Sequence, residues 1–222
     1  MILRPDQLDL KQKIYNAWNG GARTVMAVHP TGGGKTVVTS DVFKDFNAAP
    51  NIAMAHRQEL VGQISLTFAR FGIYHKLIAP KSVISFVQDT HRQELGRSYY
   101  NPDALCAVGG VDTIIRRDFK NDIWAQKCGL AFVDEGHHVL KTNKWGKAFE
   151  QFPNARKLLV TASPRRADGK GLGRDYDGIV DTMVESIDMR GLIEIGALTD
   201  YKIYAPPSDF NVDALKIGTT GD

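Results

Sequence analysis

The amino-acid sequence predicts an α/β fold in which helices cover both faces of a mostly parallel β-sheet. Short apolar runs alternate with longer amphipathic stretches along the 222 residues, as they do in chains that alternate strands with crossover helices. A glycine-rich loop directly follows the first apolar run, where a strand would lead into a helix. Hydrophobic residues make up 43% and charged residues 24% of the chain, which excludes a wholly disordered protein, a collagen-like repeat and a disulfide miniprotein.

The predicted elements follow this alternation in order. Each predicted strand is a short apolar run of the kind that a buried strand needs: 24–28, 51–55, 82–87, 104–108, 130–133 and 157–160. The stretches at about 35–46 and 58–71 are predicted to be helices, and Leu60, Ile64 and Phe68 form one apolar stripe of the second. Residues 201–205 fit one more strand, and Pro206-Pro207 marks a break after it.

The net charge of +3 hides an asymmetry between two parts of the chain. Residues 1–174 contain 25 Lys and Arg against 15 Asp and Glu, a net of +10. Residues 175–222 contain 3 Lys and Arg against 10 Asp and Glu, a net of −7. The basic part could present a face to a polyanion, although charges scattered over a solvated surface would give the same count.

The sequence indicates a cytoplasmic protein. No apolar run approaches the roughly 18 residues of a membrane span, and the N-terminus has no apolar signal core. The two cysteines, Cys106 and Cys128, lie in largely apolar stretches, so we expect buried, reduced thiols.

The segment His29-Pro30-Thr31-Gly32-Gly33-Gly34-Lys35-Thr36 has the composition of a phosphate-binding loop. Glycines let successive N–H groups point inward, and the following helix N-terminus adds positive potential. Lys35 would reach the β- and γ-phosphates, and the Thr36 hydroxyl would ligate Mg²⁺. The strict pattern fails at one position, because His29 stands where a glycine is usual.

An acidic pair supplies the other groups that phosphate chemistry needs. Asp134 ends an apolar strand and is followed by Glu135, Gly136, His137 and His138. Asp134 would hold Mg²⁺ at the carboxyl edge of the sheet, and Glu135 would act as general base on the attacking water. A zinc site of Cys128, His137 and His138 is the competing interpretation, but it lacks the paired spacing of zinc ligands.

The sequence resembles the superfamily-two helicases and translocases of the DEAD/DEAH type, whose Asp-Glu-x-His box Asp134-Glu135-Gly136-His137 matches. Four further segments resemble motifs of this group in the expected order: the adenine-reading Arg-x-x-Gln in Leu3-Arg4-Pro5-Asp6-Gln7, motif Ia in 55–60 with Gln63, motif Ib in 109–117, and motif III in Thr161-Ala162-Ser163. Residues 164–172 and 191–201 are closest to the RadD-like DNA-repair helicases and their phage relatives. The resemblance covers nearly the whole chain.

The resemblance implies a RecA-like P-loop NTPase domain at 1–205, followed at 206–222 by a terminal segment or linker toward a second RecA-like domain. It implies ATP and Mg²⁺ as ligands. It also implies that ATP hydrolysis is coupled to movement along a nucleic acid, and it favours DNA over RNA. Arg4 and Gln7 would bind adenine, and Thr31 to Thr36 the phosphates. His137 would couple this site to Thr161 and Ser163. The implied nucleic-acid contacts are Arg57, Thr113 and Arg116 or Arg117.

Some features depart from the family pattern. Asp6 and Asp112 stand where an aromatic residue and a glutamine are common. Only 59 residues follow Ser163, too few for a second RecA-like domain, and no Gln-x-x-Gly-Arg-x-x-Arg segment is present. We therefore expect this chain alone to hydrolyse ATP slowly. The alternatives are a nucleic-acid-binding module with little turnover, an RNA-directed helicase, and a P-loop kinase or GTPase, although no guanine-reading Thr/Asn-Lys-x-Asp motif is present.

Overall fold

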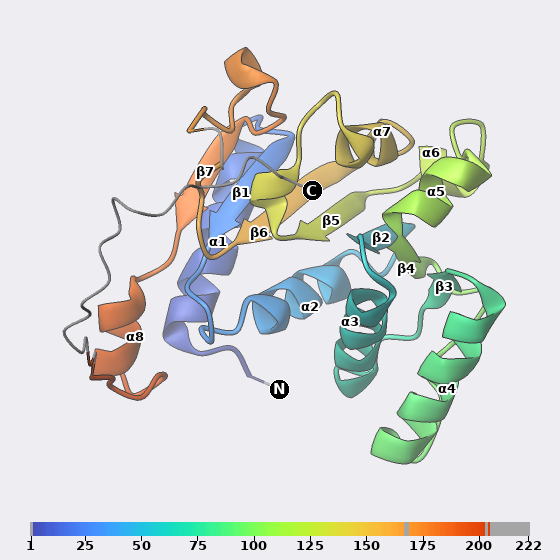
Figure 1. The fold of residues 1–222 in the computed structure, drawn as a ribbon, viewed down its shortest axis with the longest axis horizontal. Coiled ribbons are helices and arrows are strands. Elements are labelled where there is room, and N and C mark those ends of the chain that lie inside the picture. Colours follow the sequence, from blue (N-terminus) through green and yellow to red (C-terminus); the bar gives the residue numbers. More distant parts are fainter. Residues whose placement is uncertain (1, 167–168, 203, 205–222) are drawn as a thin grey trace, which may run out of the picture.

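The computed structural model describes residues 2–166, 169–202 and 204, and its centre is an all-parallel β-sheet (Figure 1). The described strands pair in the order β3-β4-β2-β5-β6-β1-β7. Their bounds are β1 Thr24–Val28, β2 Asn51–Ala55, β3 Lys76–Ile78, β4 Cys106–Gly110, β5 Leu130–Asp134, β6 Arg156–Thr161 and β7 Thr182–Glu185. Because all the pairs are parallel, the carboxyl ends of the strands meet at one edge of the sheet.

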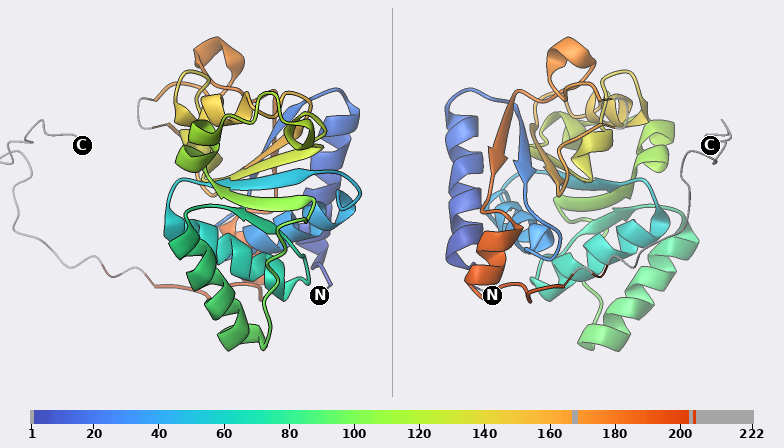
Figure 2. Two further views of the ribbon diagram at one scale, coloured as in Figure 1. Left: turned by 90° about the vertical axis from the view of Figure 1, so that its right-hand side faces the viewer. Right: turned by 60° about the vertical axis from the view of Figure 1, so that its left-hand side comes forward.

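Helices form a layer on each face of the sheet (Figure 2). One layer contains α1 Pro5–Asn19, α2 Lys35–Asp45, α3 Gln58–Arg70 and α4 Lys81–Leu95. The other contains α5 Val111–Arg117, α6 Ile123–Gln126 and α7 Lys144–Phe149. Two short 3-10 helices, Gly136–His138 and Arg174–Tyr176, lie in loops, and α8 Met189–Glu194 lies beside the start of α1.

The strands direct alternate side chains into two separate apolar cores. In β5, Leu130 and Phe132 face the layer of α1 to α4, whereas Ala131 and Val133 face the layer of α5 to α7. This follows from the two-residue period of a strand, and it explains why the strands at the centre of the sheet are largely apolar on both faces. The predicted α/β fold with helices on both faces is confirmed, and the mostly parallel sheet is parallel at every described pair.

The strand predicted at 82–87 is wrong. Residues 82–87 belong to α4, which begins after Pro80 and continues to Leu95. The buried residues of this helix, Val83, Val87 and His91, recur every four positions. That spacing is the period of a helix that buries one face.

The predicted strands at 24–28, 51–55, 104–108, 130–133 and 157–160 and both predicted helices are present within two residues of their expected bounds. The two strands at the sheet edges, β3 and β7, are absent from the sequence prediction. Tyr201, Lys202 and Tyr204 lie outside any strand, whereas Ile203, Ala205 and the predicted terminal segment 206–222 lie outside the described residues.

The two cysteines are free thiols, and both are buried as expected. Burial raises the pKa of Cys128 to about 12, so this thiol is protonated at neutral pH. None of the helices in residues 2–166, 169–202 and 204 has the length and apolar character required to cross a membrane.

Candidate functional site

The carboxyl edge of the sheet carries the predicted site residues in a spatial order that differs from their order in the sequence. Along the edge, motif Ib follows β4, motif Ia follows β2, the acidic pair ends β5, motif III begins at the end of β6, and the phosphate loop follows β1. The segments expected to bind nucleotide and those expected to bind nucleic acid therefore occupy adjoining halves of one edge.

The phosphate loop joins β1 to α2, and its glycines meet specific requirements. Gly34 precedes α2 with φ 98°, a left-handed conformation that favours glycine. A Cβ at Gly34 would also lie 2.5 Å from Gln7 Nε2, and one at Gly33 would lie 2.7 Å from the His29 ring. Larger side chains would therefore displace the loop or its neighbours. The loop leaves Lys35 at the start of α2, where its ammonium makes no hydrogen bond or ion pair within the described part of the chain.

Arg4 and Gln7 lie against this loop. The Arg4 guanidinium donates to the Gly33 carbonyl at 2.6 Å, and the Gln7 side-chain amide donates to the same oxygen at 3.1 Å. Asp6 is buried and holds Arg4 through an ion pair of 2.9 Å. The acid that departs from the family pattern thus orients the arginine expected on the adenine side.

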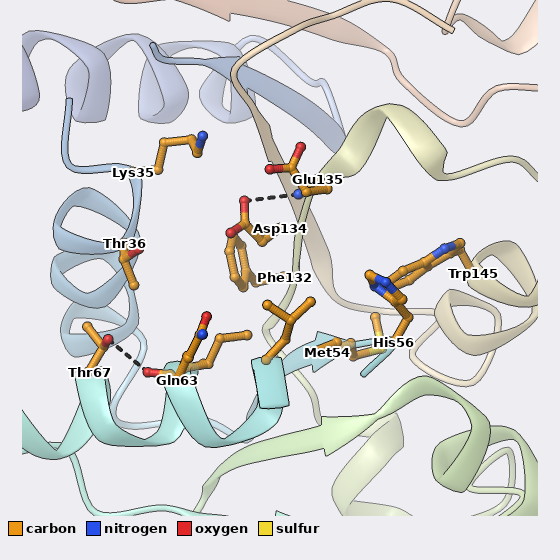
Figure 3. Close-up of a pocket in the computed structure, with 13 residues that line it drawn as sticks. Lys35, Thr36, Met54, His56, Gln63, Thr67, Phe132, Asp134, Glu135 and Trp145 are labelled. Atoms are coloured by element: carbon orange, nitrogen blue, oxygen red, sulfur yellow. Dashed lines mark hydrogen bonds between the residues drawn. The ribbon is translucent and has the colours of Figure 1, made fainter. Parts of the chain in front are cut away.

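The acidic pair lies across a gap from Lys35 (Figure 3). Asp134 accepts a hydrogen bond of 2.9 Å from the Glu135 N–H, and burial raises the pKa of the Asp134 carboxyl. Glu135 has φ 53° and ψ 46°, a left-handed conformation rare for a side chain of this size. Strained backbone of this kind often marks residues that a site holds in a particular direction.

A cavity of about 220 Å³ lies between the loop and the acidic pair. Lys35, Thr36, Asp134 and Glu135 line its polar side. The remaining lining is mostly apolar and comes from β2, the turn after it, α3, β5 and α7: Met54, Ala55, His56, Leu60, Gln63, Ile64, Thr67, Phe132 and Trp145. The hydroxyl and carboxylate oxygens of Thr36 and Asp134 are donors that suit Mg²⁺, and the unpaired Lys35 suits a phosphate.

The three residues expected to couple the site to motif III are in contact. His137 Nδ1 lies 2.8 Å from Thr161 Oγ1 and 3.4 Å from a Glu135 carboxylate oxygen. The Ser163 N–H donates to Thr161 Oγ1 at 3.1 Å, so Ser163 joins through its backbone. Burial lowers the pKa of His137, which favours a neutral ring at this junction.

The predicted nucleic-acid contacts lie at the ends of two adjacent strands. Arg57 precedes α3 after β2, and Thr113 lies in the first turn of α5 after β4. Arg57, Arg116 and Arg117 are exposed. The Arg116 guanidinium donates to the Asp112 carbonyl at 3.1 Å and that of Arg117 to the Ala79 carbonyl at 3.4 Å. The arrangement leaves cationic groups at the water-facing end of this half of the edge.

The competing zinc interpretation does not fit this arrangement. Cys128 precedes β5, whereas His137 and His138 follow its other end. Among residues 2–166, 169–202 and 204, no three His, Cys, Asp or Glu side chains are grouped as a metal site would require.

The comparisons with known proteins agree with these motifs. Residues 1–166 match the family described as "Type III restriction enzyme, res subunit". The chain belongs to this family. The chain is also 28% identical over 225 residues to IRC3 of Saccharomyces cerevisiae, a protein whose name assigns it to the ATP-dependent helicases. That match covers 94% of this chain and 30% of IRC3.

Two solved structures show the same fold as this chain. The UvsW helicase of bacteriophage T4 has a TM-score of 0.58 at 17% identity, covering 83% of this chain and 60% of that one. The restriction-modification enzyme LlaGI, solved with a DNA substrate mimic, has a TM-score of 0.61 at 11% identity, covering 89% and 21%. The chain is a first RecA-like domain of the superfamily-two type, and it spans about a third of the length of the curated relatives it matches.

Some contacts of this domain had no signal in its sequence. His29 lies within hydrogen-bond distance of Ser186, which follows β7 and is 157 positions away. Leu192 and Leu198 pack on the phosphate loop beside Gly33 and Gly32. Local patterns do not encode such distant partners, although the unusual His29 marks the position from which they could be sought.

Proposed function

We propose that this chain is the first motor domain of an ATP-dependent DNA helicase or translocase. The observation that carries the proposal is the convergence of Lys35, Thr36, Asp134 and Glu135 on one cavity at the carboxyl edge of the sheet. A second observation is that the exposed arginines occupy the adjoining half of the same edge. A motor needs both halves of the edge, because ATP hydrolysis at one half must change how the residues of the other half bind the nucleic acid.

The residues divide the chemistry between them. The loop N–H groups and Lys35 bind the phosphates, and Gln7 and Arg4 bind the adenine side. Thr36 and Asp134 would hold Mg²⁺, which when bound neutralises charge on the β- and γ-phosphates. Glu135 accepts a proton from the water that attacks the γ-phosphorus, and the bond to the β–γ bridging oxygen breaks to give ADP and phosphate. The His137–Thr161 contact links this step to motif III.

A second RecA-like domain would complete the site with an arginine at the γ-phosphate. Such a residue contributes about 10³ to 10⁵ in rate in related phosphoryl-transfer enzymes. We therefore expect the 222-residue chain to bind ATP weakly and to hydrolyse it slowly. Brisk DNA-stimulated turnover by this chain, abolished by Lys35→Ala, would contradict that expectation.

Two substitutions separate binding from chemistry. Lys35→Ala removes the phosphate-binding ammonium and should weaken ATP binding, whereas Glu135→Gln should leave binding nearly intact and lower hydrolysis by about 10²-fold or more. Binding is measured by titration with a fluorescent ATP analogue, and hydrolysis by phosphate release in a single turnover. Lys147→Ala and Glu150→Gln are matched controls, because both residues are exposed at the far end of α7. Equal hydrolysis by Glu135→Gln and the unsubstituted chain would reject Glu135 as the base.

The nucleic acid is the finer part of the proposal. LlaGI, whose fold is similar, was solved with a DNA substrate mimic, which supports DNA over RNA. Titration with single-stranded DNA, duplex DNA and RNA of equal length decides between them, and tighter binding to RNA would favour the RNA-directed alternative. A RadD-like role in repair, and action in the cytoplasm of a bacterium or a phage-infected host, belong to this proposal.

A further inference from the structure

His29 occupies the position where the phosphate-loop pattern usually has a glycine, and it is completely buried. Its ring lies under the loop, because a Cβ at Gly33 would come within 2.7 Å of both Cε1 and Nε2. The ring and the glycine above it therefore form a matched pair. A side chain of this size at the first position of the loop must either make contacts that stabilise the loop or strain it.

The hydrogen bonds around His29 favour a proton on Nδ1. His29 Nδ1 lies 2.6 Å from Ser186 Oγ, and Ser186 Oγ donates its one hydrogen to the Ile187 carbonyl at 2.8 Å. With the hydroxyl hydrogen directed at Ile187, Nδ1 carries a hydrogen and donates it to Ser186. The ring is directed toward the segment after β7 by this one bond, since Nε2 is buried without a partner among the described residues.

The segment that His29 contacts also packs on the loop. Leu192 of α8 is completely buried, and its Cδ1 lies 3.1 Å from the position of a Cβ at Gly33. Leu198 Cδ2 lies 2.8 Å from the corresponding position at Gly32. The backbone adds a further link, because the Ser186 N–H donates to the Val28 carbonyl directly before the loop. Residues 186–198 thus support the loop from the side of β7.

We propose that His29 and Ser186 are positioning residues that clasp the phosphate loop to residues 186–198 and hold it in its nucleotide-binding shape. The proposal rests on ATP being the ligand of this loop. It assigns a part of the nucleotide site to a segment about 150 residues downstream, and it gives the departure at His29 a reason. The clasp acts through the loop, and neither residue needs to touch the nucleotide.

Substitutions at both ends of the bond test the clasp. Ser186→Ala removes the acceptor with little change in volume, and should weaken binding of mant-ADP about fivefold, the usual net value of one hydrogen bond. His29→Asn places an amide nitrogen near the former Nδ1 and should retain affinity. His29→Gln places its amide near Nε2 and should behave like Ser186→Ala. Ser82→Ala is a matched control on the exposed side of α4.

Two results would overturn the clasp. Wild-type affinity in Ser186→Ala, or rescue by glutamine and not by asparagine, would show that the Nδ1 bond does not position the loop. A double-mutant cycle sharpens the test, because His29→Gln with Ser186→Ala should bind no worse than either single variant. Additive losses would mean that the two residues act separately.

Hydrogen exchange without nucleotide separates the clasp from the proposed function. Ser186→Ala should raise amide exchange in both 29–36 and 186–198, whereas Ser82→Ala should change neither. Unchanged exchange would reject the clasp even where ADP binds. If the unsubstituted chain bound no ADP, the proposed function would fail and the nucleotide-positioning role with it, while the exchange result would still report on the bond itself.

Discussion

Glu135 combines a reactive side chain with an unfavourable backbone. Its φ of 53° is one of three positive values among the described non-glycine residues, together with Asp118 and Asp177. The conformation turns the chain sharply after β5, so that Asp134 and Glu135 both line the cavity. A left-handed residue of the L series costs about 1–2 kcal/mol relative to an ordinary conformation. The fold therefore loses some stability at Glu135, and in return the Asp134 and Glu135 side chains are directed into the cavity.

Replacing Glu135 with glycine and with alanine should reveal this strain. Glycine tolerates φ 53° and alanine does not, so Glu135→Gly should be more stable than Glu135→Ala by about 1 kcal/mol. Both variants should lose ATP hydrolysis, since neither can accept the proton. Urea unfolding measures the difference. Glu150, which is helical with φ −62° at the end of α7, provides the control, where alanine should be the more stable of the two. Equal stability of the two Glu135 variants would contradict the strain.

A buried chain of hydrogen bonds joins α3, β3 and α4. Ser65, His75 and His91 are each completely buried. His75 Nδ1 donates to the Ile73 carbonyl at 2.9 Å, so its Nε2 accepts from the Ser65 hydroxyl. His91 Nδ1 accepts from the Tyr99 N–H at 3.3 Å, so its Nε2 donates to Ser65 Oγ at 3.2 Å. The network is complete only when both rings are neutral.

Acid should therefore destabilise this group of elements. Burial lowers the pKa of His75 to about 4 and also lowers that of His91. Between pH 6.5 and pH 4 the unfolded chain binds more protons than the folded one, so stability is present above pH 6.5 and is lost as pH falls. The His75 contribution alone predicts a loss of about 2 kcal/mol from pH 7 to pH 5.

The measurement is the free energy of urea unfolding as a function of pH. His75→Gln should be less stable at pH 7 but should show a shallower decline toward pH 5. The exposed His138 provides the control, and His138→Gln should keep the slope of the unsubstituted chain. An unchanged slope in His75→Gln would exclude the buried ring as the source.

The sequence predicted those elements and site residues whose signal is local. The apolar strands at the centre of the sheet were found because both faces are buried, and Gly34-Lys35-Thr36 and Asp134-Glu135 were found because their chemistry requires adjacent residues. The edge strands β3 and β7 were missed, since β3 has three residues and β7 alternates half-buried with exposed positions. The strand prediction at 82–87 is wrong because this short apolar run is only the first part of a helix. Val83 and Val87 lie on its buried face, and the residues that follow up to Leu95 are mostly polar.

On the scale of the whole molecule, the order of the strands divides one edge between two ligands. The arginines lie on the side of β4 and β2, and the phosphate loop lies on the side of β1. A single strand held along the first half would be bound mainly through its phosphates. Of the Lys and Arg residues behind the net charge of +10 in residues 1–174, those that contact phosphates would then contribute to the affinity for nucleic acid, and their contribution would depend on salt.

Binding of single-stranded DNA should depend on salt in a way that counts these contacts. Each phosphate contact contributes about 0.7 to the slope of log affinity against log salt. Arg57→Ala and Arg116→Ala should each reduce the slope by about that amount. Arg97 is exposed and lies just after the C-terminal end of α4, so Arg97→Ala should leave the slope unchanged. Fluorescence anisotropy at several salt concentrations gives the slopes. An equal reduction by Arg97→Ala would indicate only general attraction.

The strand order also sets a fixed distance. From β1 to β4 there are four steps across the sheet, and at about 4.8 Å per step the two strands are about 19 Å apart. Hydrogen-bonded strands with a packed core on each face form a stiff plate, which resists stretching along this direction. The domain would therefore hold the phosphate loop and the arginines at a constant distance from each other. Any stepping along a nucleic acid would have to come from rotation of the whole plate against another body.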